Sequence, residues 1–352
     1  MKVGLIGHRG AGKTTIFNML TGLQAQTGGF GGKEEIHLGV IKVPDARIDK
    51  LSAIFKPKKT TYAEIRFTDF PPSEGEENLK SNQAMVAQMR EVDAITLVLR
   101  DFGAEAKPIK ELIDLMTEMI LADLAVVENR RSRLKKEKAR PQEEALLARC
   151  AEVLENEQSL RALSFSADEE SLASGFGFLS RKPLLVIFNE PEEQAGKPLD
   201  PAYQQELNRR GLQGLALAGK VEMEIAQLDE KDRVGFLKEI GIDESARERF
   251  IRASYALLNL ISFFTAGEDE VRAWTIRRGG TAVDAAGAIH SDLARGFIRA
   301  EVMKCDDLLA AGAERGSGHA AEVHLKETAK LHLKGKDYIV EDGDIVHVRH
   351  SG

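Results

Sequence analysis

The feature that most constrains this chain is an eight-residue run close to its start. The run, GHRGAGKT at positions 7–14, satisfies the pattern G-x-x-x-x-G-K-[ST] in full. An apolar segment typical of a buried strand, 2–6, precedes it, and a segment with helical spacing of apolar residues, 15–23, follows it. Glycines let the backbone curl so that several N–H groups point at phosphate oxygens, and the following helix offers its positive end. The run therefore predicts a triphosphate-binding loop between a strand and a helix.

The residue types in this loop suggest individual roles. Lys13 can reach the β- and γ-phosphates of a nucleotide, which makes it the candidate catalytic residue by charge neutralisation. The hydroxyl of Thr14 can bind Mg²⁺, and Asp69, at the end of a predicted strand, can hold the ion through water. A dinucleotide-binding fingerprint fits less well, because the glycine spacing is not G-x-G-x-x-G. The loop residues predicted to bind nucleotide are Gly10, Ala11, Gly12, Lys13, Thr14 and Thr15.

The pattern along the first three quarters of the chain predicts an α/β fold with a largely parallel sheet. Apolar or alternating segments indicate strands, and helical patterns such as 84–92 lie between them. The segment 107–163 differs, because it is nearly free of glycine and shows apolar residues at three- and four-residue spacing on both sides of Pro141. It predicts an inserted, coiled-coil-like helical hairpin that turns near 140–141. The further predicted strands are 36–43, 63–69, 94–99 and 183–189.

A third region follows, with strand-like segments at 271–276, 297–302 and 345–348 separated by glycine-containing turns. This pattern predicts a small β-rich domain. The predicted organisation is thus a nucleotide-binding domain, an inserted helical hairpin and a C-terminal domain. Their respective boundaries are 1–106 with 164–264, 107–163, and 265–352.

Composition indicates the cellular compartment and limits the classes of partner that the chain can bind. The 352 residues carry a net charge of −7, which argues against nucleic-acid binding over the whole surface. The two cysteines, Cys150 and Cys305, lie far apart, so neither a disulfide framework nor a structural zinc site is expected. A signal peptide and a membrane-spanning segment are not expected either, and we predict a cytoplasmic protein without a membrane partner. The segment 130–140 has seven basic residues and one acidic residue, which suits RNA phosphates or a solvated helix face equally well.

The residues after the strand 184–188 bear on the choice of nucleotide. GTP-specific proteins of this architecture usually carry Asn-Lys-x-Asp there, whereas this chain has Asn189-Glu190-Pro191-Glu192. This N-x-x-E pattern resembles the YchF-type ATPases within the Obg-related branch of the translation-factor GTPases. Other similar segments are VPDARIDKL at 43–51, KPKK at 56–59, REVDA at 90–94, FTAGE at 264–268, AGAIHSD at 286–292, GFIRAE at 296–301 and EDGDIVH at 341–347.

The resemblance implies a P-loop domain, a helical insertion and a C-terminal TGS-like domain. It also implies that ATP is preferred, with GTP possible, that Asn189, Glu192 and the loop at Gly219 bind nucleotide, and that the chain associates with ribosomes or ribosomal RNA. The chain diverges in the switch regions. Lys33 stands where the family has a switch I threonine, and Pro72, which lacks an N–H, stands where it has the switch II glycine.

Three functions are compatible with these residues. The leading hypothesis is a weak Mg²⁺-dependent ATPase that regulates binding to the ribosome. A second hypothesis is a nucleotide-binding ribosome factor without significant hydrolysis, or a GTPase that prefers GTP. A third is a small-molecule kinase, which the phosphate-binding loop alone favours and which leaves the C-terminal domain unexplained.

Overall fold

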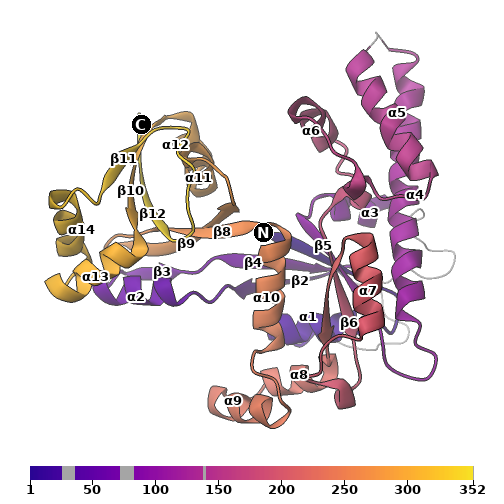
Figure 1. Cartoon of the computed structure of the whole chain (residues 1–352), viewed down its shortest axis with the longest axis horizontal. Coiled ribbons are helices and arrows are strands. Elements are labelled where there is room, and N and C mark those ends of the chain that lie inside the picture. Colours follow the sequence, from indigo (N-terminus) through magenta and orange to yellow (C-terminus); the bar gives the residue numbers. More distant parts are fainter. Residues whose placement is uncertain (26–35, 72–82, 138–139, 352) are drawn as a thin grey trace. The chain divides into compact units, whose positions relative to one another are not determined.

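The computed structural model describes residues 1–25, 36–71, 83–137 and 140–351. The chain forms two compact units, one comprising 1–40 and 66–257 and the other comprising 41–65 and 258–352 (Figure 1). Two strands, β2 (His37–Lys42) and β4 (Glu64–Asp69), cross from one unit into the other along the chain. The described ranges include no helix long and apolar enough to cross a membrane.

The first unit is built on a six-stranded sheet of order β2-β4-β1-β5-β6-β7. Strand β1 (Lys2–Ile6) pairs in parallel with β4 on one side and with β5 on the other, and β5, β6 and β7 continue the parallel register. Parallel strands direct their carboxyl ends to one edge of the sheet, so the loops that follow β1, β4, β5, β6 and β7 meet there. The remaining strands are β5 (Ala94–Arg100), β6 (Leu184–Asn189) and β7 (Gln213–Leu217).

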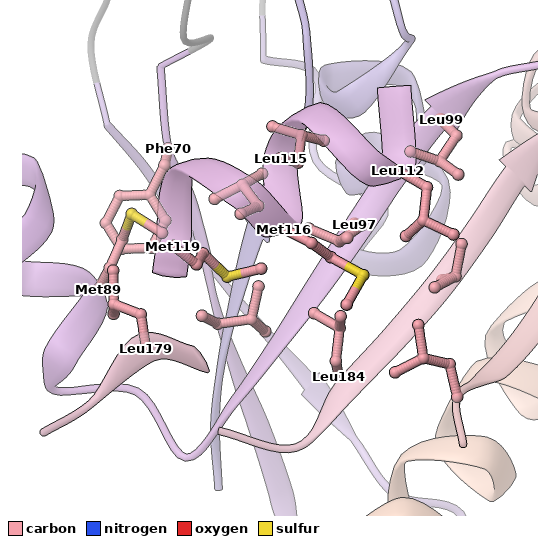
Figure 2. Close-up of a cluster of buried hydrophobic side chains, with 14 of the residues drawn as sticks. Phe70, Met89, Leu97, Leu99, Leu112, Leu115, Met116, Met119, Leu179 and Leu184 are labelled. Atoms are coloured by element: carbon pink, nitrogen blue, oxygen red, sulfur yellow. The ribbon is translucent and has the colours of Figure 1, made fainter. Parts of the chain in front are cut away.

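Helices cover the faces of this sheet in the layered arrangement predicted for an α/β fold. On one face, Leu112, Leu115 and Met119 of α4 point toward Leu97 of β5 and Leu184 of β6 (Figure 2). This face is a continuous apolar layer of fully buried side chains. The helices of the unit are α1 (Lys13–Thr21), α3 (Gln83–Arg90), α4 (Pro108–Leu134), α5 (Pro141–Glu155), α6 (Ala167–Ser174), α7 (Pro201–Arg210), α8 (Gly219–Ala226), α9 (Glu230–Glu239) and α10 (Ala246–Leu257), with 3₁₀ turns at Leu160–Ala162, Leu179–Arg181 and Glu192–Gln194.

The predicted helical hairpin is present as α4 and α5. The first half of α4 packs on the sheet, and its second half packs on α5 and α6 in a separate apolar cluster (Figure 1). The hairpin is therefore continuous with the core of the unit through α4. The sequence pattern did not distinguish the two halves, because both carry apolar residues at the same helical spacing.

A buried carboxylate fixes α4 to the rest of the unit. Asp123 of α4 is fully buried and accepts hydrogen bonds from the guanidinium of Arg90, at 3.0 Å, and from the backbone N–H groups of Leu179 and Ser180, at 3.0 and 2.7 Å. Arg90 also donates to the carbonyl oxygen of Gly177 at 3.0 Å. A buried charge requires such a complete set of partners, since desolvation otherwise outweighs the attraction. Arg90 opens the REVDA segment quoted above, so this contact gives that segment a structural role.

The second unit is built on a six-stranded mixed sheet of order β11-β10-β12-β8-β9-β3. In the described part of this unit, the strands predicted from sequence are present, together with five helices that the sequence pattern did not indicate. The short β3 (Lys59–Thr61) pairs in parallel with β9, which places part of the early segment 41–65 in this unit. The elements are α2 (Ala46–Phe55), β3, β8 (Leu260–Thr265), β9 (Glu270–Arg277), α11 (Ala282–Ile289), α12 (Ser291–Arg295), β10 (Phe297–Lys304), α13 (Cys305–Arg315), α14 (Gly318–Glu327), β11 (His332–Lys334) and β12 (Asp344–His350).

Ion pairs within this unit explain why 41–65 belongs to it. Arg47, in the first turn of α2, pairs with the capping residue Asp45 and also donates to the carboxylate of Asp342 at 2.7 Å. Asp342 in turn accepts from the backbone N–H of Ser262 at 2.9 Å. The sequence-based boundaries placed all of 1–106 in the nucleotide-binding domain and began the C-terminal domain at 265. Contacts between residues this far apart in sequence leave no signal in local periodicity.

We predict that Asp123→Ala lowers the free energy of unfolding by about 3 kcal/mol, because it leaves the Arg90 charge and two backbone N–H groups without their partner. Urea unfolding followed by circular dichroism measures this loss. The matched control is Glu128→Ala, at an exposed position of the same helix, which should change stability by less than about 0.5 kcal/mol. Equal effects of the two substitutions would contradict the role given to Asp123.

Candidate nucleotide-binding site

The loop 7–14 connects β1 to α1 and has the backbone shape that its sequence predicts. Gly12 is the N-cap of α1 and has a φ of 85°, in the left-handed region that favours glycine. A side chain at Gly12 would also collide with the amide of Asn189. Because glycine has no side chain, Gly12 cannot cap the first N–H groups of α1. Free N–H groups at a helix N-terminus form an anion-binding site.

The side chain of Lys13 lies under this loop. It is buried, with 7% of the residue exposed, and its Nζ donates to the carbonyl oxygen of Gly7 at 3.0 Å. Gly7 itself packs so closely against the carbonyl of Val98 in β5 that a side chain would collide with it. The ammonium group is therefore held at the loop by the backbone around it. This is the position that charge neutralisation of a bound phosphate requires.

The two residues predicted to bind metal lie in contact. Thr14 donates its hydroxyl proton to Oδ2 of Asp69 at 3.1 Å, and His37 Nδ1 lies 3.6 Å from the same oxygen. Asp69 is buried, with 3% exposed, and its Oδ1 has no hydrogen-bond partner among the described residues. Burial raises the pKa of Asp69, and the charge of Lys13 and the hydrogen bond from Thr14 act against that rise. A buried carboxylate oxygen without a partner next to a hydroxyl is a donor set that fits Mg²⁺.

The number of protein ligands is consistent with that ion. In the described part of the chain no cluster of three or more His, Cys, Asp or Glu side chains could hold a metal by itself. Mg²⁺ is commonly held by one or two protein oxygens together with phosphates and waters, so such a cluster is not needed. The residues that would hold the ion are Thr14 directly and Asp69 through water.

Asn189 connects the phosphate-binding loop to the loop after β7. Its amide nitrogen donates to the carbonyl oxygen of Ala11 at 2.9 Å, and its Oδ1 accepts from the N–H of Gly219 at 3.1 Å. Asn189 is buried, and both ends of its amide are occupied. The structure thus brings three of the predicted site residues together, with Asn189 as a bridge between the other two.

A second set of hydrogen bonds, which the sequence analysis did not predict, also holds the loop at Gly219. Glu222 of α8, which is buried, accepts from the N–H of Ala218 at 3.1 Å and from Arg249 of α10 at 2.5 Å. Arg249 also donates to the carbonyl of Ala216 in β7 at 2.9 Å. No local signal indicates this pair, because the two residues lie far apart in sequence on helices of unremarkable composition.

The other predicted site residues are less enclosed. Thr15 lies in the first turn of α1 and is half-buried. Glu192 is exposed and begins the 3₁₀ turn after β6. The divergences noted at Lys33 and Pro72 lie outside the described residues.

A group of acidic side chains at the same edge of the sheet was also missed. Asp101 follows β5 and accepts from the hydroxyl of Tyr203 at 3.0 Å, while Tyr203 stacks on Phe188 of β6. Burial, followed by the negative charges of Asp101 and Asp200, raises the pKa of Glu190 to about 7. Burial also raises the pKa of Asp101 itself. The edge that carries the phosphate-binding loop therefore has a carboxylate that titrates near neutral pH.

In the structure, some basic residues of the segment 130–140 form ion pairs, and others are exposed. Arg130 pairs with Glu143 of α5, its Nε lying 2.6 Å from Oε1, and with Glu137 at 3.0 Å, and Arg140 approaches Glu143 at 3.5 Å. These contacts join the two helices near the end of the hairpin. Exposed basic residues in the described part of the segment are Arg133, Lys135, Lys136 and Arg140.

The fold and the loop together define a P-loop protein with the GTPase fold. Residues 2–130 match a family model described as a 50S ribosome-binding GTPase, and residues 260–351 match the C-terminal model of YchF GTPases, described as a protein of unknown function. Curated relatives named ribosome-binding ATPase YchF are 34% identical in Bacillus subtilis (99% of each chain covered) and 36% identical in Escherichia coli O157:H7 (98% of each). The solved YchF GTPase of Schizosaccharomyces pombe superposes with a TM-score of 0.80 at 27% identity, covering 99% of this chain and 97% of that one. The chain belongs to the YchF family.

We predict that Asn189→Ala lowers the free energy of unfolding by about 1–3 kcal/mol, because it leaves the carbonyl of Ala11 and the N–H of Gly219 without partners. Urea unfolding measures the loss. Asn208→Ala, at an exposed position on α7, is the matched control and should change stability by less than about 0.5 kcal/mol. An unchanged midpoint for Asn189→Ala would show that the bridge is not needed for folding.

Glu190 predicts a pH dependence of stability. Its pKa is higher in the folded chain than the ordinary value of a glutamate, so the folded state binds more protons than the unfolded state between about pH 4.5 and 7. The contribution of Glu190 to the free energy of unfolding should therefore fall as the pH rises through that window. The fall should be on the order of 1 kcal/mol, because the carboxylate is only half-buried and solvent screens its charge. Glu190→Gln should remove this part of the fall between pH 5 and 8, whereas Glu192→Gln, at an exposed neighbour, should keep it. Parallel pH profiles for wild type and Glu190→Gln would refute this role.

Proposed function

We propose that the chain is a Mg²⁺-dependent ATP-binding protein with weak ATPase activity that acts as a regulatory factor on the ribosome. The observation that carries this proposal is the arrangement around the phosphate-binding loop. A buried ammonium from Lys13 and a hydroxyl from Thr14 on a buried carboxylate, Asp69, meet at the N-terminus of α1. These are the groups that bind a triphosphate with its metal.

Each residue has a distinct part in this function. The N–H groups at the start of α1 bind phosphate oxygens, and Lys13 exchanges its bond to the Gly7 carbonyl for the β- and γ-phosphates. The hydroxyl oxygen of Thr14 would bind Mg²⁺ directly, and Asp69 would accept a hydrogen bond from a water bound to the ion. Bound Mg²⁺ supplies positive charge to the developing negative charge on the phosphates. Positioning and charge neutralisation support slow hydrolysis without a dedicated base, and no side chain in the described ranges is assigned as one.

The preference for ATP rests on the segment after β6. Because Asn189 is occupied as a bridge, discrimination between bases falls to residues beside it, with Glu192 in the fourth position of the N-x-x-E pattern. The relatives named above are called ATPases, which supports the same assignment. A preference for GTP is the alternative that the GTPase fold leaves open.

The ribosomal partner is supported by the names of the relatives and by charge. Exposed basic residues near the end of the hairpin, including Arg133, Lys135 and Lys136, offer contacts to RNA phosphates. Arg130 is assigned instead to holding α4 and α5 together. In this proposal the hairpin is an insertion that contacts the ribosome, the first unit binds the nucleotide, and the protein acts in the cytoplasm.

A second candidate is a nucleotide-binding ribosome factor that does not hydrolyse its nucleotide. It is favoured by Pro72, which cannot donate the backbone hydrogen bond that a switch II glycine gives to the γ-phosphate. Release of inorganic phosphate from ATP over many hours, with and without ribosomes, separates the two. No release above a Lys13→Ala control under either condition would favour the second candidate.

We predict that a non-hydrolysable ATP analogue binds the nucleotide-free protein in the presence of Mg²⁺ more tightly than the GTP analogue, as measured by calorimetry. Thr14→Ala should weaken the Mg²⁺-dependent part of binding by about tenfold or more, since it removes a metal ligand. Thr14→Ser keeps the hydroxyl and is the matched control, with binding close to wild type. Tighter binding of the GTP analogue would overturn the ATPase assignment, and binding of neither would overturn nucleotide binding itself.

A further inference from the structure

A small cavity in the first unit is lined by residues of α1, α8, α9 and α10, and its α1 residue, Met19, lies toward the end of that helix farther from the phosphate-binding loop. Its volume is about 50 Å³. A cavity needs only about 10–15 Å³ on this measure to hold one water, so this one accommodates several waters or a single small ion. Its lining residues are Met19, Glu222, Ile225, Ala226, Arg233, Leu237, Ser245, Ala246 and Arg247.

Two arginines line this cavity and bring positive charge to it. Arg233 of α9 donates through Nη2 to the backbone carbonyl of Leu228 at 3.0 Å, and its buried Nε has no partner among the residues that the structure describes. Arg247 of α10 forms no ion pair in the described part of the chain. Both guanidinium groups belong to the lining of the same cavity. Burial, followed by the like charge of Arg233, lowers the pKa of Arg247, and the charge of Glu248 acts against that change.

The negative groups around the cavity do not balance these charges. The carboxylate of Glu222 is already used, because one oxygen accepts from the N–H of Ala218 and the other from Arg249. Glu248 accepts from the N–H and the hydroxyl of Ser245. The C-terminal end of α1, near Arg247, contributes about half an elementary negative charge. The two positive charges of Arg233 and Arg247 thus face one carboxylate, that of Glu248, and about half a negative charge from the end of α1. The described residues leave a net positive charge, which favours a bound anion.

We propose that this cavity is an oxyanion site that binds one free phosphate ion through Arg233 and Arg247. Guanidinium groups match the oxygens of phosphate in geometry and form strong, charge-assisted hydrogen bonds with them. The size of the cavity fits a single tetrahedral ion and leaves no room for a polynucleotide chain. The small volume favours the free ion over an RNA phosphodiester.

The cavity is positioned to influence the nucleotide-binding site. One wall is α8, whose Glu222 holds the loop at Gly219, and another is α1, which begins at the phosphate-binding loop. An ion that joins α9 and α10 across α8 would stabilise that loop. This coupling rests on the proposed function, whereas the oxyanion site does not.

The test is calorimetric titration of the full chain with inorganic phosphate. Because the phosphate-binding loop also attracts phosphate, the titration uses the Lys13→Ala variant, and wild type is fitted to two sites in parallel. We expect one site to remain in Lys13→Ala, and we expect Arg233→Gln and Arg247→Gln each to weaken it by about ten- to a hundredfold. Arg247→Lys, which keeps the charge, should bind more tightly than Arg247→Gln. Arg252→Gln, at an exposed position of the same helix, should leave it unchanged.

Two further measurements keep the proposal open to refutation. In phosphate-free buffer Arg247→Gln should be at least as stable as wild type, because it removes a repulsion, and added phosphate should raise the melting temperature of wild type but not of the variant. Dimethyl phosphate, a diester, should bind much more weakly than inorganic phosphate. Absence of the second phosphate site, its persistence in both glutamine variants, or equal binding of the diester would overturn the proposal. Nucleotide binding can fail in calorimetry while this site is retained, so the two failures are distinguishable.

Discussion

The amide of Asn189 is the contact on which the arrangement of the candidate site depends. It joins the carbonyl of Ala11, in the loop after β1, to the N–H of Gly219, in the loop after β7. The outer strand β7 and the central strand β1 are separated by β5 and β6 in the sheet, so their loops would otherwise move independently. One side chain at the end of β6 reaches both because a primary amide offers a donor and an acceptor in fixed geometry.

Buried polar side chains that join separate elements through hydrogen bonds also occur away from the loop. Asp123 accepts hydrogen bonds from Arg90 and two backbone N–H groups, and Glu222 accepts them from Arg249 and the N–H of Ala218. In each case a buried carboxylate is balanced by an arginine and completed by backbone donors, as the cost of burying charge requires. These clusters join elements that hydrophobic packing alone would leave free to slide. They explain how the helical hairpin and the base of the loop at Gly219 are fixed to one sheet.

Sequence reasoning reached those features whose cause is local. The pattern GHRGAGKT specifies its own backbone shape through Gly12 and Lys13, and strand alternation specified β1, β4, β5 and β6 to within a residue or two. The helices α13 and α14 were missed although their apolar residues are about as periodic as those of α4, because glycines at 312, 316 and 318 resemble turn signals. The bridging role of Asn189 was missed for a different reason. A sequence motif specifies the type of residue at a position. The hydrogen-bond partners of that residue depend on which loops the fold places beside it.

The candidate site is electrically polarised along the edge of the sheet. At one end, the start of α1 and the ammonium of Lys13 present positive charge beneath the loop. Next to Asn189, burial and the negative charge of Asp101 raise the pKa of Glu190, so this part of the edge disfavours further negative charge. A nucleotide is polarised in the opposite sense, with its phosphates negative and its base neutral. Only one orientation therefore places the phosphates on the positive end and keeps them away from the carboxylates, and the arrangement selects that orientation before any contact with the base is made.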